Sequence, residues 1–514
     1  MTGTTLSDLL GSSASTWPSR VAVGDAAGPR ALTYRELDAV VSDLASQLRP
    51  LGVARGDTVG LFSDNCLEYV LALFAVVATG ASAAPLNPGL APPQVTARLA
   101  ALGAAVTIVP AHLYDGFVKA HPAMAGTTWN LALDEGPEWQ AHVVTSQASP
   151  VRAPAVAPVP GDVALLMMTS GTTAAPKVVP LTHANLLASI DGICTVYNLT
   201  PVDATLLVMP LSHGHGLVAG LLATLASGGA AYVPTGGRFH AGSFWPDMVT
   251  AGATWYTAVP TIHQILLARA GTDYPKDGYK RLRFVRSCSA ALAPAVSSDL
   301  EAAFSAPVVQ AYGMTETAHQ VASNPLPTGG PDMPASVGLA TGVEIQVTGP
   351  DGRPAATART GEVWIRGASV TSGYLNNAEA NASSFSARWF RTGDLAYKDA
   401  DGYLFLTGRI KEIINRGGEK ISPAAVDAVL QSNPKVQDAL SFGVPDQHYG
   451  EEINAAVVLR HGQSATEAEL KQYALAGLAP FEVPKRISFV SELPLTGKGA
   501  PDRRGLAALL APNR

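Results

Sequence analysis

Cysteine is scarce in this sequence. Its 514 residues include three cysteines, Cys66, Cys194 and Cys288, which lie far apart and form no C-x-x-C pair. Small secreted domains usually depend on many disulfides, and structural zinc sites need closely spaced cysteines or histidines. The sequence therefore excludes a disulfide framework and indicates no zinc site. We expect the protein to work in a reducing compartment.

Charge of either sign is also sparse. Charged residues make up 15% of the sequence, the formal net charge is −6, and no block of lysine and arginine stands out. Proteins that bind nucleic acids usually carry clustered positive charge. We therefore expect no nucleic-acid partner.

Targeting segments and long apolar runs are missing as well. Residues 1–15 lack the basic and apolar parts of a signal peptide, and residues 511–514 do not form the peroxisomal tripeptide S-K-L. No apolar stretch reaches the length that a bilayer requires. We therefore expect a cytoplasmic protein without a membrane span.

What the sequence does have is length and apolar content. With 47% hydrophobic residues, 514 residues are too many for one ordinary core, so we expect two or more domains. Thr33 and Glu36 have the spacing of a capping box, and apolar residues follow them at helical period up to Leu48. The next expected elements are a strand at 58–62, a helix at 68–77 and a strand at 81–85. This alternation continues to about residue 300 and predicts a layered α/β fold with largely parallel sheets.

The pattern changes after residue 349. Turn signals there surround short β-branched runs, which predict a small β-rich lobe. Beyond Arg409 the sequence has an α+β pattern of its own, long enough for a separate small domain. We predict a large N-terminal domain over residues 1–408 and a small C-terminal domain over residues 409–514. The expected elements are strands at 362–366, 402–409, 439–444 and 453–459 and helices at 423–431 and 467–474.

A loop of hydroxyl-bearing residues follows an apolar run at 163–168, which predicts a buried strand. Residues 169–177 read TSGTTAAPK and end in Lys177. Hydroxyls, accessible backbone N–H groups and one lysine suit a polyphosphate. The loop lacks the Walker A spacing, and an ordinary surface turn has a similar composition. Taken alone, it predicts only a candidate phosphate site.

Further motifs follow in a fixed order. They are residues 210–216 (PLSHGHG), 310–317 (QAYGMTET), 389–394 (WFRTGD), 408–412 (GRIKE) and 415–423 (NRGGEKISP). Together with the loop at 169–177, these motifs resemble those of the AMP-forming acyl-CoA synthetases, the acyl-adenylate-forming superfamily. The resemblance covers nearly the whole chain, and the combination is far more specific than any single motif. It implies two α/β sheets plus a β lobe in the N-terminal domain, and a mobile C-terminal domain.

The resemblance also implies the cofactors ATP, Mg²⁺ and CoA. A carboxylic acid would first become an acyl-adenylate and then a CoA thioester. Thr315 would meet the α-phosphate, and Glu316 would hold Mg²⁺, which prefers oxygen ligands. The β- and γ-phosphates would be held by Thr169, Ser170, Gly171, Thr172, Thr173 and Lys177.

Nucleoside and CoA contacts follow from the remaining motifs. By resemblance, Tyr312 would stack on adenine beside Gly313. Asp394, with help from Arg409, would accept hydrogen bonds from the ribose hydroxyls. The small domain would rotate about the hinge residue Lys411. That rotation would bring a group of three residues towards CoA, namely Gly417, Gly418 and Lys420.

Other stretches are similar to those of the plant and fungal oxalate–CoA ligases. They are residues 237–239, 244–248, 253–264, 282–289 and 449–454. Oxalate keeps a second carboxylate after the first is activated, and burying that charge without partners is unfavourable. The resemblance places His213, His215, Arg286, Ser287, Ser289 and His319 around the acid.

Not all of these side chains need contact the acid. We expect His319 and Ser289 to bind its second carboxylate. His213 and His215 could instead orient or gate the substrate. Arg286 could instead form an ion pair on a strand.

One motif departs from the family pattern. Residues 493–504 read LPLTGKGAPDRR, where the family has approximately L-P-K-T-x-S-G-K-I-x-R-R. The alignment places Ala500 at the position of the catalytic lysine. We favour an introduced change over a natural one, because the surrounding motif is intact. Lys498 is an alternative lysine, but Gly499 aligns without a shift.

Two other functions stay open. The chain could activate another small or aromatic acid and transfer it to an amine or a carrier in place of CoA. Alternatively, it could be a catalytically inactive protein that binds nucleotide or acyl-AMP, since Ala500 stands at the lysine position. Calorimetric titration with ATP and acid, beside a CoA-thioester assay, separates these functions.

Overall fold

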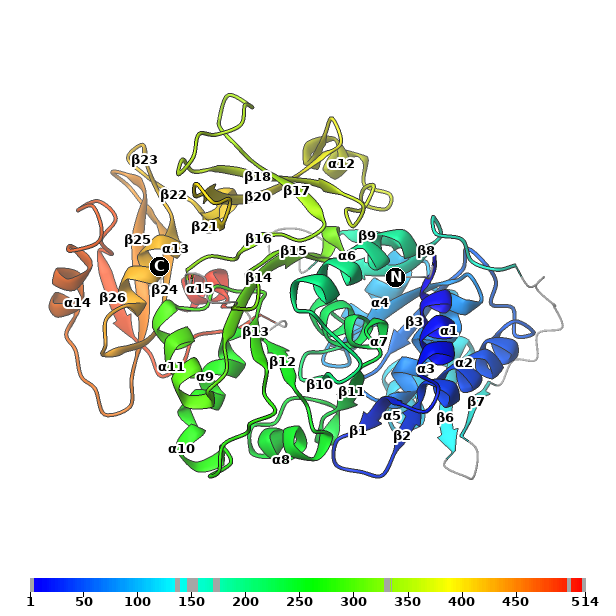
Figure 1. The fold of residues 1–514 in the computed structure, drawn as a ribbon. Coiled ribbons are helices and arrows are strands. Elements are labelled where there is room, and N and C mark those ends of the chain that lie inside the picture. Colours follow the sequence, from blue (N-terminus) through cyan, green and yellow to red (C-terminus); the bar gives the residue numbers. More distant parts are fainter. Residues whose placement is uncertain are drawn as a thin grey trace.

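The computed structural model describes residues 4–134, 139–145, 156–169, 176–327, 333, 335–496 and 501–510. Two large sheets and a β lobe form the N-terminal part, and a smaller sheet with its own helices forms the C-terminal part (Figure 1). The predicted fold class is confirmed. In the described part of the chain, no helix is long and apolar enough to cross a membrane.

The seven-stranded sheet has the order β7-β6-β5-β3-β4-β8-β9. Its central strands are parallel, and β7 and β9 are antiparallel edges. The predicted strands at 58–62 and 163–168 are β3 and β8, and the strand expected at 81–85 is β4, one residue further on. The bounds are β3 (Thr58–Phe62), β4 (Ser82–Leu86), β5 (Val106–Pro110), β6 (Thr128–Asp134), β7 (Gln140–Val144), β8 (Val163–Met168) and β9 (Val178–Thr182).

The nine-stranded sheet has the order β16-β15-β14-β13-β12-β10-β11-β1-β2. Its strands β10 to β14 run parallel and end at a common edge. The bounds are β1 (Val21–Asp25), β2 (Ala31–Thr33), β10 (Ala204–Leu206), β11 (Ala230–Val233), β12 (Trp255–Ala258), β13 (Phe284–Ser287), β14 (Val308–Met314), β15 (His319–Ser323) and β16 (Leu339–Ala340).

Helices pack on these sheets around separate apolar clusters, one of which contains the buried apolar residues of α2 and α3. In α2 (Tyr34–Leu48), the Thr33 side chain caps the first turn and Glu36 returns the hydrogen bond, as the capping-box spacing predicts. The helix expected at 68–77 is α3 (Leu67–Ala78), which is buried almost throughout. The other helices of the two sheets are α1 (Leu6–Thr16), α4 (Pro92–Leu102), α5 (Ala111–Ala120), η1 (Pro122–Thr127), α6 (His183–Val196), η2 (His215–Leu222), α7 (Ala223–Ala226), η3 (Thr235–Gly237), α8 (Ala241–Ala251), α9 (Pro260–Ala268), α10 (Ala270–Asp273), α11 (Pro294–Phe304) and η4 (Thr315–Thr317).

The β lobe follows the nine-stranded sheet along the chain. Its strands are antiparallel, and the strand expected at 362–366 lies within β18. The bounds are β17 (Val343–Thr348), β18 (Gly361–Gly367), α12 (Ala378–Ser384), β19 (Phe385–Ser386), β20 (Trp389–Lys398) and β21 (Leu404–Arg409).

The C-terminal part forms a sheet of order β23-β22-β25-β24 with β26 beside β25. It has its own apolar core, which includes Ile414, Val426 and Ile453. The two helices predicted for this part have the expected bounds. The elements are η5 (Ile410–Glu412), β22 (Ile414–Arg416), β23 (Glu419–Ile421), α13 (Pro423–Gln431), β24 (Val436–Asp446), β25 (Gly450–Leu459), α14 (Glu467–Ala474), β26 (Arg486–Phe489) and α15 (Arg503–Leu510). The domain boundary between residues 408 and 409, at the end of β21, stays a prediction.

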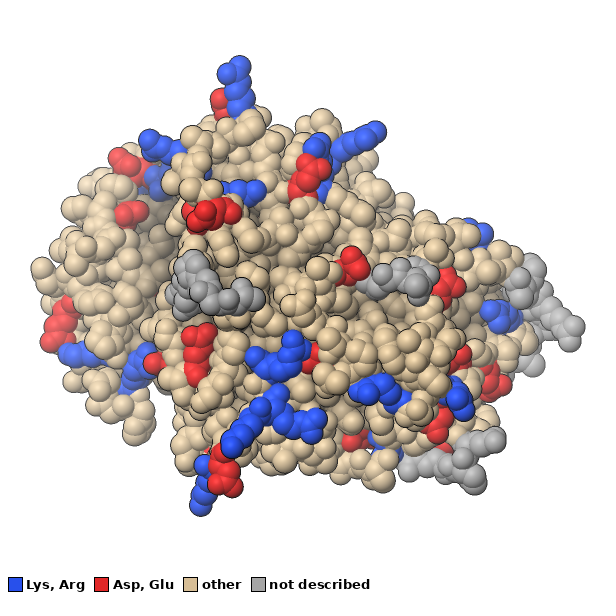
Figure 2. Space-filling view, viewed as in Figure 1, with Lys and Arg blue, Asp and Glu red and all other residues tan. Residues whose placement is uncertain are grey.

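Charged side chains are distributed over the visible face of the molecule. Lys and Arg are interspersed with Asp and Glu across most of this face (Figure 2). This pattern agrees with the low charged content of the sequence.

Candidate active site

The predicted phosphate loop begins at the carboxyl end of β8. Thr169 N donates to Lys177 O at 2.9 Å, and Lys177 N donates to Thr169 Oγ1 at 3.1 Å. These two bonds join the ends of the loop. Ser170, Gly171, Thr172 and Thr173 lie outside the described residues. In open α/β sheets, ligands bind at the carboxyl ends of the strands, and β8 ends there.

Lys177 and Glu316 lie on either side of Tyr374. Lys177 Nζ is 4.2 Å from the centre of the Tyr374 ring, and the Tyr374 hydroxyl donates to Glu316 Oε1 at 2.8 Å. Burial lowers the pKa of Lys177, the charge of Lys411 lowers it further, and Glu316 acts in the opposite direction. The hinge candidate Lys411 and Glu316 are therefore each close enough to Lys177 to influence its charge.

Thr315 and Glu316 form η4, directly after β14. Just before η4, the backbone of β14 is packed against β15, because a Cβ on Gly313 would lie 1.5 Å from the carbonyl oxygen of His319. A real Cβ cannot approach so closely, so this position requires glycine. Glu316 O also accepts from Thr371 N at 2.8 Å. These two contacts fix the backbone on either side of Thr315.

Glu316 suits the Mg²⁺ that the sequence predicts. Among the described residues, no group of three or more His, Cys, Asp or Glu could hold a metal. Mg²⁺ is usually bound by one or two carboxylates, with substrate phosphates and water as the other ligands. A single carboxylate beside the phosphate loop fits that ligand set.

Tyr312, Asp394 and Arg409 form the predicted nucleoside group. The Tyr312 hydroxyl donates to Asp394 Oδ2 at 2.5 Å, and Arg409 Nε is 2.8 Å from Asp394 Oδ1. Asp394 is 4% exposed. Burial raises the pKa of its carboxyl, although Arg409 and Tyr312 act in the opposite direction. Both carboxylate oxygens thus have a donor, and Arg409 keeps a counter-charge beside the anion.

The acid-side cluster consists of Tyr197, His215, Thr257, Arg286, Ser289, His319 and Gln320. Its centre is Arg286, which is 0% exposed. Arg286 donates from Nε to the Tyr197 hydroxyl (2.8 Å), from Nη1 to Thr257 Oγ1 (2.9 Å), and from Nη2 to Gln320 Oε1 (2.9 Å). Nη2 is also 3.0 Å from His319 Nε2. Sheet register brings the cluster together, since Thr257 on β12 is the direct neighbour of Arg286 on β13.

The two histidines of the cluster stack on each other. The ring centres of His215 and His319 are 5.2 Å apart, with an angle of 19° between the planes. His215 Nδ1 is 3.0 Å from Ser289 Oγ, and its Nε2 is 2.6 Å from Thr257 Oγ1. Burial lowers the pKa of both imidazoles, and the neighbouring Arg286 lowers them further. Both rings are therefore neutral near pH 7.

Two predicted acid-site residues lie outside these contacts. Ser287 is buried, and its hydroxyl has no hydrogen-bond partner among the residues that the structure describes. His213 lies before the π-helix η2, with its backbone N bonded to Pro210 O at 3.1 Å. A π-helix is rare and often marks a functional site. Here it carries His215 into the cluster.

The predicted CoA-facing residues lie on the C-terminal hairpin. Gly417 and Gly418 have φ angles of +61° and +98°, and they form the two-residue turn between β22 and β23. Such turns need positive φ at both positions, which favours glycine. Lys420 is exposed on β23, and Lys411 lies in η5.

The terminal motif is anchored on both sides of residues 497–500. Leu495 forms a bridge with Pro501, and Asp502 N donates to Pro494 O at 2.8 Å. Arg503 pairs with Asp427 at 2.5 Å and with Glu412 at 3.3 Å. Ala500 and Lys498 lie outside the described residues.

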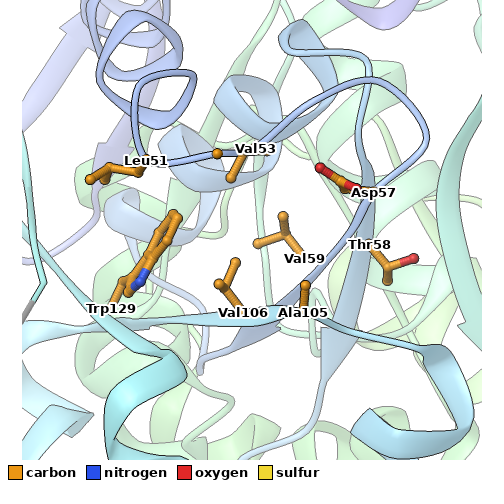
Figure 3. Close-up of a pocket in the computed structure, with 9 residues that line it drawn as sticks. Leu51, Val53, Asp57, Thr58, Val59, Ala105, Val106 and Trp129 are labelled. Atoms are coloured by element: carbon orange, nitrogen blue, oxygen red, sulfur yellow. The ribbon is translucent and has the colours of Figure 1, made fainter. Parts of the chain in front are cut away.

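A cavity away from these residues is lined by Leu51, Gly52, Val53, Asp57, Thr58, Val59, Ala105, Val106 and Trp129 (Figure 3). Thr58 begins β3 and Val106 begins β5, which run parallel. The cavity therefore lies at the amino ends of the strands. The candidate active site lies at the opposite edge, where ligands of α/β sheets bind.

Sequence reasoning missed Tyr197, Thr257, Gln320 and Tyr374. Gln320 is next to the predicted site residue His319, but no sequence pattern indicates that its amide oxygen accepts from Arg286. Thr257 lies in one of the stretches similar to oxalate–CoA ligases. Its pairing with Arg286 depends on strand register, which a single sequence does not reveal.

The chain is similar to known proteins over its full length. Residues 10–375 match the AMP-binding enzyme family, and residues 425–500 match the AMP-binding enzyme C-terminal domain. An oxalate–CoA ligase of Arabidopsis thaliana is 45% identical over 99% of both chains. A sulfoacetate–CoA ligase of Cupriavidus necator is 34% identical over 97% of this chain and 96% of that protein.

A solved structure has the same fold. The ATP-bound crystal structure of MatB from Rhodopseudomonas palustris superimposes with a TM-score of 0.86 and 27% identity, over 98% of both chains. CoA ligases that form AMP use ATP, Mg²⁺ and CoA, in agreement with the sequence prediction. The chain belongs to the AMP-binding enzyme family, as an ATP-dependent acid–CoA ligase.

Proposed function

We propose that this ligase converts oxalate to oxalyl-CoA. The observation that carries the proposal is Arg286, a fully buried guanidinium with no carboxylate partner among the described residues. A buried charge without a counter-ion is strongly unfavourable. An acid with a second anionic group supplies that counter-charge when it binds.

The relatives support the same chemistry. The substrates named for the two related ligases, oxalate and sulfoacetate, each carry a second anionic group beside the carboxylate that is activated. Identity to the oxalate–CoA ligase is higher, 45% against 34%. We therefore assign oxalate to this chain.

The reaction has two steps. A carboxylate oxygen of the acid attacks the α-phosphate of ATP, and pyrophosphate leaves. The CoA thiol then attacks the acyl carbon, loses its proton and displaces AMP. Charge grows on the phosphates in the first step, so fixed donors aimed at them lower the barrier. Mg²⁺, when bound, supplies further charge stabilisation on the phosphate oxygens.

We assign the phosphate contacts to the carboxyl edge of the two sheets. Lys177, with Thr169 and the loop residues Ser170, Gly171, Thr172 and Thr173, would hold the β- and γ-phosphates. Thr315 would donate to the α-phosphate, and Glu316 would hold Mg²⁺.

Nucleoside and CoA contacts complete the assignment. Asp394 and Arg409 would bind the ribose, and Tyr312 with Gly313 would border the adenine. The C-terminal domain would rotate about Lys411 for the second step. Its exposed turn of Gly417 and Gly418, with Lys420, would then contact CoA.

We further propose that Ala500 is an introduced replacement of the catalytic lysine. Leu493, Pro494, Thr496 and Gly499 before it, and Arg503 and Arg504 after it, all match the family motif. Arg503 pairs with two carboxylates, so the motif is held in place on the side that follows Ala500. Loss of the lysine would impair adenylation.

An acid screen with the Ala500→Lys protein tests the proposed substrate. Pyrophosphate release and CoA-thioester formation are measured with oxalate, malonate, sulfoacetate, acetate and coumarate. We expect the highest kcat/KM with oxalate. A preference for coumarate or acetate would refute the assignment, and pyrophosphate release without a thioester would point to another acceptor.

A further inference from the structure

The hydrogen bonds around Arg286 fix the direction of the protons in the acid-side cluster. We propose that Arg286 polarises two relays of donors that end at the acid's second carboxylate. One relay runs through Thr257 and His215 to the Ser289 hydroxyl. The other runs through His319 alone. The proposal rests on the proposed function, because it names what binds the second carboxylate of that acid.

The shorter relay follows from the chemistry of arginine. A guanidinium has only donors and keeps its charge in proteins. Because Arg286 Nη2 is 3.0 Å from His319 Nε2, that nitrogen must accept, and it carries no proton. The proton of the neutral ring is then on Nδ1. His319 thus presents an Nδ1–H donor, for which the described residues provide no acceptor.

The longer relay depends on the Thr257 hydroxyl. Its oxygen accepts from Arg286 Nη1 at 2.9 Å, so its own proton is free to donate. Among the described residues, the acceptor within reach is His215 Nε2, at 2.6 Å. His215 therefore carries its proton on Nδ1, which donates to Ser289 Oγ at 3.0 Å. The Ser289 hydroxyl is left with a proton to donate.

The stacked histidine rings bring the two relays together, since Ser289 is bonded to one ring and the other ring ends its own relay. The rings of His215 and His319 are stacked with their centres 5.2 Å apart. Ser289 is exposed, and no described residue accepts from its hydroxyl. Two neighbouring donors match the two oxygens of a carboxylate. Low pKa values keep both rings neutral, as these proton positions require.

Space for the acid is left by a glycine. A Cβ on Gly214 would lie 3.3 Å from His319 Cβ and 3.9 Å from its Nδ1. A side chain at residue 214 would therefore crowd the donor atom of His319. The absence of one keeps this nitrogen accessible.

Thr257 becomes a positioning residue for acid recognition. It acts through His215 and Ser289, and its change to valine removes the hydroxyl while keeping the shape. In the Ala500→Lys protein, we expect Thr257→Val to raise the KM for oxalate about 10- to 100-fold, the effect of a lost hydrogen bond to a charged group. The KM for acetate should change less than about threefold. Thr257→Ser keeps the hydroxyl and should restore oxalate use.

A matched control is available on the neighbouring strand. Thr205 on β10 is also buried, and its hydroxyl has no hydrogen-bond partner among the described residues. Thr205→Val should leave both KM values unchanged. If Thr257→Val behaves like this control, the longer relay is wrong.

Double variants separate a relay from a general structural role. If Thr257 acts through Ser289, Thr257→Val should add nothing to Ser289→Ala. His319 lies on the other relay. When Thr257→Val is combined with His319→Gln, the two increases in the KM for oxalate should therefore multiply. Multiplication in both pairs would overturn the longer relay.

Nitrogen NMR tests the proton positions without any substrate. With ¹⁵N-labelled histidine, and signals assigned by His215→Asn and His319→Gln, we expect both rings neutral with the proton on Nδ1. An Nε2–H or a cationic ring would overturn the corresponding relay, even if oxalate is the substrate. If both rings show Nδ1–H but oxalate is not used, the proposed substrate fails and the proton order stands.

Discussion

The Tyr312 hydroxyl donates to Asp394 Oδ2 at 2.5 Å and so joins β14 of the nine-stranded sheet to β20 of the β lobe. Arg409, the last residue of β21, holds the other oxygen of Asp394. The nine-stranded sheet and two neighbouring strands of the β lobe, β20 and β21, thus meet at one buried carboxylate.

Asp394→Asn should weaken ATP binding. The amide has one acceptor oxygen where the carboxylate has two, and it carries no charge for Arg409. A lost hydrogen bond to a charged group is worth about 1.5–3 kcal/mol, so we expect the Kd for ATP to rise about 10- to 100-fold. Calorimetric titration measures it. Asp401→Asn, in an exposed turn, is the matched control. An unchanged Kd for Asp394→Asn would remove this residue from the nucleotide site.

Glu316→Gln should reduce the effect of Mg²⁺ on ATP binding. The amide is a poor Mg²⁺ ligand, because it lacks the negative charge of the carboxylate. ATP affinity is measured with Mg²⁺ and with EDTA. We expect the ratio of the two affinities to fall in the variant, while the affinity in EDTA stays the same or rises.

Tyr374→Phe provides a control for that ratio. It removes the hydroxyl that donates to Glu316 and leaves the carboxylate in place. The Mg²⁺ effect should persist. If Glu316→Gln keeps the full Mg²⁺ effect, another residue holds the metal.

Ala500→Lys should speed adenylate formation. A donor aimed at developing charge is worth roughly 10²–10³ in rate. In the proposed mechanism the second step would use a different face of the small domain, including Gly418 and Lys420, so thioester formation from a supplied acyl-adenylate should change little. Single-turnover kinetics of both steps measure this. If neither step responds, Lys498 or another group has the role.

His183 should make stability depend on pH in the acidic range. Burial lowers the pKa of His183 to about 4, and its Nδ1 accepts from Leu6 N at 3.1 Å. The unfolded imidazole takes up a proton near pH 6.5, but the folded one does not until about pH 4. This contribution is therefore complete above pH 6.5 and is lost as the pH falls towards 4.

Urea unfolding followed by tryptophan fluorescence checks this contribution. Between pH 7 and pH 4.5, His183→Gln should lose about 2–3 kcal/mol less unfolding free energy than the parent protein. His240→Gln, at an exposed position, should lose as much as the parent. Equal losses in parent and His183→Gln would show that His183 takes up its proton in the folded state.

Local signals explain why much of the fold followed from the sequence. The capping box of Thr33 and Glu36 and the proline that begins α13 act within one helical turn, so helix positions could be read directly. The strands at 58–62 and 163–168 were apolar runs bounded by turns. The resemblance of the motifs to the family then implied that two α/β sheets and a β lobe form the N-terminal domain.

The acid-side cluster could be predicted only in part. His215, Arg286, Ser289 and His319 were expected near the acid, but their hydrogen-bond partners were not. Tyr197 is 89 residues from Arg286 in sequence, and Thr257 is 29 residues away. Such pairs arise from strand register and from the packing of a helix end on a sheet, which local patterns do not encode.

Tyr374 shows the same limit for the phosphate side. It lies 58 residues beyond Glu316 in sequence. Its hydroxyl donates to the Glu316 carboxylate, and its ring faces the Lys177 ammonium group. Lys177 and Glu316 each belong to a motif that the sequence analysis recognised, whereas Tyr374 belongs to none. Its position became evident only from the folded chain.

Gly313 joins the proposed nucleoside site to the proposed acid site. Its missing side chain lets the strand of Tyr312 pass directly against the backbone of His319, with no room for a single methyl group. A backbone shift at Tyr312, in the proposed nucleoside site, would therefore reach His319, in the proposed acid site. Attempts to redesign this ligase for larger acids have to treat both sites as one unit, because moving His319 outward displaces the strand that carries Tyr312 and, through it, Asp394.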